Sequence, residues 1–135
     1  MKISGACHCG EISYEAEIDK DKVVICHCTD CQIISGSAYR ISVSTPNKLF
    51  RLIKGLPKTY IKIGDSGNKR LMAFCGNCGS HVYATDAITS EAISIRVGTI
   101  NERASLFPFL QVWNKSSLSW AKDLRKIASK EMQNA

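Results

Sequence analysis

Seven cysteines of this 135-residue chain are spaced as metal ligands usually are, and they fall into three short clusters. The first cluster is Cys7 and Cys9, the second is Cys26, Cys28 and Cys31, and the third is Cys75 and Cys78. Thiolates at such spacing typically bind zinc, so we predict two zinc ions per chain. Two closed tetrahedral sites need eight ligands, and seven thiolates leave one site a ligand short. An open position is the usual mark of a catalytic zinc.

The third cluster, a Cys-x-x-Cys followed by glycine, predicts a zinc knuckle that needs two more ligands from elsewhere. Either the first cluster or the Cys28–Cys31 pair has suitable spacing to supply them. We favour the first cluster, because three cysteines within six residues can converge on a metal of their own. If Cys28 and Cys31 bound the knuckle zinc instead, the thiolate of Cys26 would be left next to a zinc that it does not bind. Thiolate clusters also suit iron, but the knuckle spacing favours zinc.

The three histidines are weaker ligand candidates than the cysteines. His8 and His27 each lie between two cysteines, and in an extended Cys-x-Cys segment the middle side chain points away from its neighbours. His81 follows the third cluster and could complete a coordination shell, although we expect it on a strand face or a pocket wall.

Length and composition predict a single domain over residues 1–135 that can bury one core, with 44% hydrophobic and 22% charged residues. No run of about 20 apolar residues is available for a membrane helix, and the N-terminus lacks the apolar segment of a secretory signal. We therefore expect a cytoplasmic protein without a membrane partner, in a reducing compartment where clustered cysteines bind metal rather than form disulfides.

The net charge of +6 is unevenly distributed. Residues 48–70 contain seven basic side chains and only Asp65 as an acid. The simpler interpretation is a solvated strand face, and the alternative is an anion-binding surface. Few aromatic residues accompany these charges (Phe50 and Tyr60), so we do not expect a surface on which nucleic-acid bases stack.

Alternating apolar residues predict a mainly β, antiparallel domain with the cysteine clusters in its turns. The expected strands span residues 11–18, 23–25, 39–43, 49–53, 59–63, 69–74, 82–84 and 92–97. The spacing of Trp120, Leu124 and Ile127 predicts a short C-terminal helix, with Ser119 as its N-cap.

The clusters and their flanking glycines resemble the glutathione-dependent formaldehyde-activating enzyme family, which includes centromere-protein-V-like proteins. The matching stretches are residues 5–14, 26–37 and 74–80, in the same order and with the same cysteine spacing. The resemblance implies an Mss4-like zinc fold. It implies a structural zinc on the first and third clusters, and an active-site zinc on Cys26, Cys28 and Cys31 as the catalytic group. Gln111 and Ser117 stand where family members tend to have a histidine and a lysine.

The resemblance also implies an activity, the condensation of glutathione with formaldehyde to S-hydroxymethylglutathione, classed with the carbon–sulfur lyases. A zinc with three thiolates suits a substrate thiol as its fourth ligand, and this thiolate could attack a small aldehyde. Arg40 and the basic segment are candidates for attracting a glutathione-like anion. The alternative hypothesis is a non-catalytic zinc-stabilised module that contacts nucleic acid or protein through its basic face. The oligomeric state is left open.

Overall fold

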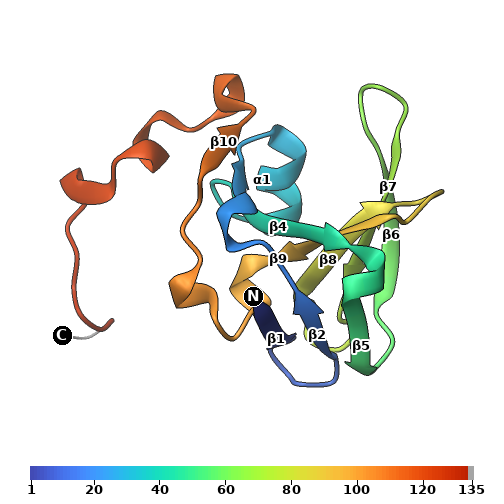
Figure 1. Ribbon diagram of the computed structural model, residues 1–135. Coiled ribbons are helices and arrows are strands. Elements are labelled where there is room, and N and C mark those ends of the chain that lie inside the picture. Colours follow the sequence, from blue (N-terminus) through green and yellow to red (C-terminus); the bar gives the residue numbers. More distant parts are fainter. Residues whose placement is uncertain (134–135) are drawn as a thin grey trace.

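Two β-sheets and one short α-helix make up the architecture of the computed structural model, which describes residues 1–133 (Figure 1). The strands are β1 (Lys2–Ala6), β2 (Ser13–Glu17), β3 (Val23–Cys26), β4 (Arg40–Pro46), β5 (Phe50–Lys54), β6 (Lys58–Ile63), β7 (Lys69–Phe74), β8 (His81–Asp86), β9 (Ala92–Arg96) and β10 (Leu110–Val112). The α-helix is α1 (Thr29–Ser35). The 3-10 turns are η1 (Lys20–Lys22), η2 (Asn47–Leu49), η3 (Val97–Thr99), η4 (Arg103–Ser105), η5 (Asn114–Ser116), η6 (Ser119–Lys122) and η7 (Leu124–Lys126).

The smaller sheet has the order β1-β2-β5, and the larger sheet has the order β10-β3-β4-β9-β8-β7-β6. All pairs are antiparallel except β10 with β3, which run parallel. The mainly β prediction is therefore confirmed, with a mixed larger sheet in place of a purely antiparallel one. No helix among residues 1–133 is long and apolar enough to cross a membrane.

The core lies between the two sheets, because both contribute to one cluster of buried side chains. Ile3 and Tyr14 come from the smaller sheet, and Val43 and Ile95 come from the larger one. An aromatic chain links the layers: the Phe50 ring stacks on Tyr14 at 5.3 Å between centroids and meets Tyr83 edge-on at 5.1 Å. Burial of this apolar surface is the main term that stabilises the fold.

The predicted C-terminal helix is wrong: the chain forms η6 and η7, separated by an extended Asp123 (φ −145°, ψ 101°). The Asp123 carboxylate accepts from the backbone N–H of Arg125 at 3.0 Å, a local bond that competes with helix formation. Trp120 and Leu124 are more than half exposed, so no apolar face packs to support a helix. In Figure 1 this segment extends from one side of the body.

Strands β1 and β10 and helix α1 were missed at the sequence level. Strand β1 carries Ser4 and Gly5 and lacks a clear alternation, and β10 is only three residues long. Helix α1 is too short to show a helical period, and its N-cap is a cysteine, Cys28, where the usual cap is Ser, Thr, Asp or Asn.

Gly5 is required by a close approach between the strands of the smaller sheet. A Cβ at this position would collide with the Tyr14 ring and with the carbonyl oxygen of Thr99. The Tyr14 hydroxyl crosses over Gly5 to bond with the Thr99 Oγ1 at 2.8 Å, and Tyr14 is 1% exposed. Neither obstacle can move without disturbing the core.

We therefore expect Gly5→Ala to lower the free energy of unfolding by about 2–3 kcal/mol, the upper range for overpacking a core. Gly98→Ala is the matched control, because a Cβ there meets no atom within 4 Å and its φ is not positive. Chemical denaturation of both variants measures the difference. Equal stability of the two variants would contradict the close approach described here.

Candidate metal centres and the pocket beside them

The seven thiols form two groups, one of four and one of three. The Sγ atoms of Cys7, Cys9, Cys75 and Cys78 all lie within 4.8 Å of one another, and so do those of Cys26, Cys28 and Cys31. The structure thus brings the first and third clusters together and keeps the second apart. All seven cysteines are free thiols.

The four-thiol group joins two turns from different sheets. Cys7 and Cys9 lie in the turn between β1 and β2, and Cys75 and Cys78 lie in the turn between β7 and β8. Ser80 connects the turns, because its Oγ accepts from the backbone N–H of His8 at 3.1 Å and lies 3.3 Å from the Cys78 Sγ.

The geometry of this group fits a tetrahedral metal. The Cys7–Cys9 and Cys9–Cys75 sulfur pairs are 3.6 and 3.7 Å apart. Four sulfurs about 2.3 Å from one zinc would stand about 3.8 Å from each other. Backbone N–H groups also point at the sulfurs, from Ile12 to Cys7 at 3.2 Å and from Cys78 to Cys75 at 3.5 Å. Such N–H donors stabilise thiolates, so the group could hold a metal.

The three-thiol group is carried by the connection from β3 into α1. Cys26 ends β3, Cys28 caps the helix with its sulfur accepting from the Cys31 N–H at 3.2 Å, and Cys31 lies in the first turn. Cys26 and Cys31 are buried. The pKa of Cys26 is lowered to about 4, first by its hydrogen bond with Cys31, whose own pKa is raised. Cys26 is thus held as thiolate, the form that binds a metal.

His27 is not directed at this metal position but at the C-terminal strand. It is 1% exposed, and its Nε2 lies 2.7 Å from the Oε1 of Gln111 on β10. Its backbone N–H donates to the carbonyl of Val112 at 3.0 Å. The Gln32 side-chain amide adds a third link between the cysteine loop and the C-terminal segment, because it donates to the carbonyls of His27 and Ser116 at 2.9 and 3.0 Å. Gln111, at the position where family members tend to have a histidine, therefore supports the loop that carries the three cysteines.

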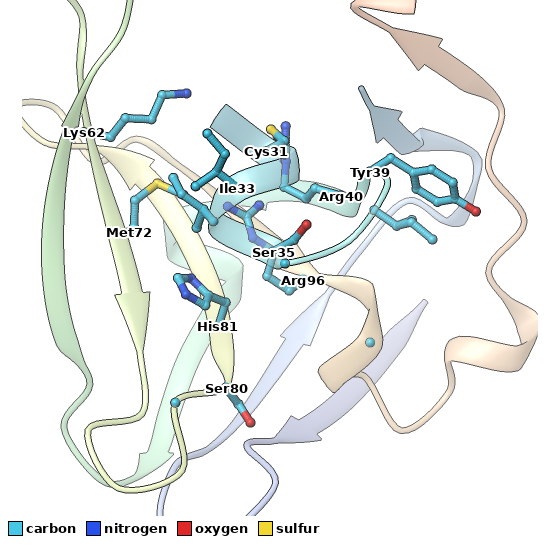
Figure 2. A pocket seen from close by; sticks show the side chains of 15 residues that line it. Cys31, Ile33, Ser35, Tyr39, Arg40, Lys62, Met72, Ser80, His81 and Arg96 are labelled. Carbon is cyan, nitrogen blue, oxygen red and sulfur yellow. Dashed lines mark hydrogen bonds between the residues drawn. The ribbon is translucent and has the colours of Figure 1, made fainter. Parts of the chain in front are cut away.

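A pocket of about 520 Å³ opens beside the three-thiol group (Figure 2). Its walls come from α1 and the turn after it, from the start of β4, from β6 and β7, and from the ends of β8 and β9. Its lining includes Cys31, Ile33, Tyr39, Arg40, Lys62, Met72, His81 and Arg96. His81 is therefore a pocket-wall residue, and Lys62 is the only member of the basic segment that lines this pocket.

Arg40 links the pocket to the thiols. Its Nε donates to the Cys31 Sγ at 3.2 Å, and its Nη1 donates to the Ser42 and Ser94 hydroxyls at 2.6 and 3.4 Å. Burial, the largest single effect, would lower the pKa of Arg40, but the charges and hydrogen bonds of Cys31 and Cys26 together more than offset it and leave this pKa raised. Arg40 is thus a fixed positive charge in contact with the three-thiol group.

Arg96 was not found from the sequence, although it lies in the same pocket. Burial first, and then the charge of Arg40, lower the pKa of Arg96 to about 9, so it is still positively charged at neutral pH. Its Nη1 is buried without a hydrogen-bond partner. A usable signal was the alternation of β9, where Ser94 and Arg96 are polar and Ile93 and Ile95 are apolar, which indicates a polar face toward a site.

His81 faces the same charge. Its ring stacks on Phe74 at 5.7 Å between centroids. Burial, followed by the charge of Arg96, lowers the pKa of His81 below its usual value of 6.5. The imidazole is therefore neutral at pH 7 and can accept a proton.

A comparison with family models decides the affiliation of the chain. Residues 2–116 match the model of the glutathione-dependent formaldehyde-activating enzyme. The chain belongs to this family. The match spans both cysteine groups and every residue of the pocket lining, and membership indicates glutathione and formaldehyde as the substrates with which the family is associated.

Among solved structures, a Rhodobacter sphaeroides protein has a similar fold, with a TM-score of 0.61 and 18% sequence identity. The alignment covers 80% of this chain and 98% of the other. No match was found among curated proteins.

The charge on Arg96 should make the fold less stable than an apolar side chain of similar length would. Transfer of an unpaired charge out of water is unfavourable, and Arg40 adds repulsion. We expect Arg96→Met to raise the free energy of unfolding by about 1 kcal/mol at pH 7, as is typical when a functional strain is removed. Thermal and chemical denaturation of the metal-loaded protein measure this, and a clear loss of stability would indicate that Arg96 has a structural role instead.

Proposed function

We propose that the protein is a zinc-dependent carbon–sulfur lyase of the S-(hydroxymethyl)glutathione synthase type, which joins a thiol to a small aldehyde or separates them. The observation that carries this proposal is the three-thiol group, whose Cys31 lines a pocket that also contains Arg40, His81 and Arg96. In this assignment Cys7, Cys9, Cys75 and Cys78 hold a structural zinc in an Mss4-like fold. Cys26, Cys28 and Cys31 hold a second zinc and are the catalytic residues.

Bound to the three-thiol group, zinc would supply the chemistry of a metal that lowers the pKa of a thiol occupying its remaining position. The protein's own residues prepare the surroundings. Arg40 fixes the Cys31 sulfur and offsets the negative charge of the thiolates. The buried apolar side chain of Met72 forms part of the pocket wall.

Proton transfer is assigned to His81. The buried Nδ1 has no partner, which leaves Nε2 as the nitrogen that a molecule in the pocket can reach. This neutral imidazole takes the proton from the thiol, and the resulting thiolate sulfur attacks the carbonyl carbon. The carbon–sulfur bond forms, the carbonyl electron pair moves to oxygen, and the oxygen takes up the proton. The reverse sequence breaks the bond.

The alternative of a basic binding module receives less support. In the basic segment, Arg51 pairs with Glu15 at 2.9 Å and Lys62 with Asp30 at 3.3 Å. Phe50 packs against the core, which leaves Tyr60 as the exposed aromatic residue of this segment. This arrangement suits a solvated strand face better than a surface for nucleic acid.

Zinc content and stability should distinguish the four-thiol group from the three-thiol group. We expect two zinc ions in the reduced protein, and one in each of the variants Cys78→Ser and Cys28→Ser, which are matched because both positions are half-buried. Cys78→Ser removes a ligand from the group that joins the two sheets, so it should cost about 3 kcal/mol or more of stability. Cys28→Ser should cost less, because its group lies within one connection. Native mass spectrometry and thermal denaturation report both quantities. Equal losses of stability would argue against a division into structural and catalytic sites.

Thiol binding tests the catalytic proposal directly. Native mass spectrometry of the reduced protein with millimolar glutathione should show one adduct per chain, absent in Cys28→Ser and retained in Cys78→Ser if that variant stays folded. Turnover of glutathione with formaldehyde should be lost in Cys28→Ser and reduced about a hundredfold in His81→Asn, as is typical when a general base is removed. If the protein contains two zinc ions but forms no thiol adduct, the proposal is wrong.

A further inference from the structure

The pocket contains two guanidinium groups and no carboxylate to balance them. Among residues 1–133, the ion pairs join Arg51 to Glu15, Lys62 to Asp30 and Arg125 to Asp123. Arg40 and Arg96 therefore have no acidic partner, and no Asp or Glu lines the pocket. Like charges side by side in a partly buried site favour an anion between them.

Arg96 is the group left for a ligand. Arg40 already uses its Nε on the Cys31 sulfur and its Nη1 on two serine hydroxyls. The Arg96 Nη1 is buried without a hydrogen-bond partner among the described residues, and the side chain lines the cavity (Figure 2). A guanidinium presents a planar fork of donors that fits a carboxylate with two parallel hydrogen bonds.

The position of this charge indicates which substrate carries the carboxylate. Arg40 donates to the Cys31 sulfur at 3.2 Å and to Ser94, two residues before Arg96 on β9, and Cys31, Arg40 and Arg96 line the same cavity. The positive charge is therefore next to the place where the carbon–sulfur bond forms. If the carbonyl carbon carries a carboxylate, the carboxylate carbon is only two bonds away from the newly attached sulfur. The carboxylates of glutathione lie at the far ends of a tripeptide.

We propose that Arg96, assisted by Arg40, binds the carboxylate of a small 2-oxo acid, of which glyoxylate is the simplest, as the carbonyl partner of the thiol. This inference rests on the proposed function and makes Arg96 a specificity-determining residue. The thiolate sulfur bonds to the carbonyl carbon, the carbonyl electron pair moves to oxygen, and the thiol proton ends on that oxygen. The product is a 2-hydroxy-2-thioether acid, and no oxidant or reductant is needed. A volume of about 520 Å³ holds such an acid together with part of a thiol.

Binding without turnover is the first test. Calorimetric titration of the zinc-loaded protein, in the absence of thiol, uses oxamate as an unreactive 2-oxo acid mimic and oxamide as its uncharged counterpart. We expect oxamate to bind about tenfold or more tightly than oxamide, and Arg96→Gln to abolish this difference, as for the loss of a charged hydrogen bond. Arg125→Gln is the control of equal charge, on an exposed side chain paired with Asp123. Oxamate that binds Arg96→Gln as well as wild type, or does not bind wild type, would overturn the proposal.

Turnover distinguishes the two possible sources of the carboxylate. With glutathione as the thiol, Arg96→Gln should lower kcat/KM for glyoxylate about tenfold or more beyond any loss that it causes with formaldehyde. If the variant instead raises the KM for glutathione equally with both aldehydes, the carboxylate belongs to the thiol and the assignment to the carbonyl partner is wrong. Oxamate binding through Arg96 without any thiol adduct would overturn the proposed function while supporting the anion site.

A folding control accompanies both tests. Arg96→Gln must retain two zinc ions and a thermal midpoint no lower than that of wild type. A large loss of stability would indicate a structural role for Arg96 and would count against the proposal. Arg96→Lys, which keeps the charge but loses the fork, should restore part of the affinity for oxamate.

Discussion

The meeting of two turns at one point is the constraint on which the remainder of this structure depends. The turn with Cys7 and Cys9 belongs to the smaller sheet, and the turn with Cys75 and Cys78 belongs to the larger one. Their four sulfurs converge within 4.8 Å, so the two sheets are joined at one end by thiols and between their faces by the apolar core. This join fixes the end of β7 and the start of β8, from which His81 enters the pocket.

The sequence predicted the features that rest on local pattern. Strands with alternating apolar residues, such as β2 and β4, were found because each has one face in the core. The convergence of the first and third clusters was the favoured one of two alternatives, because the second cluster has three cysteines close enough in sequence to form a group of their own. Helix α1 and strand β10 were missed because they are held by long-range bonds, such as those from Gln32 to Ser116 and from His27 to Val112. Such bonds leave no trace in a short window of sequence.

The wrong prediction of a C-terminal helix and the failure to find Arg96 have a common physical cause. Residues such as Trp120 and Leu124 have the spacing of an amphipathic helix, but spacing yields a helix only when the apolar face packs against something. Arg96 looks like an ordinary strand residue, and only the fold reveals that it is buried beside Arg40 without an acid. In both cases the tertiary environment, which the sequence does not display, decides the outcome.

The parallel pairing of β10 with β3 has a consequence for the order of events during synthesis. Strand β3 and the Cys26–Cys31 connection are translated well before the backbone that pairs with β3, Leu110–Val112. This contact spans more than half of the sequence, and pairings of such long range form late in folding. Until β10 is made and pairs with β3, the three thiols of this connection lack this neighbour and are accessible on that side to metal donors and oxidants.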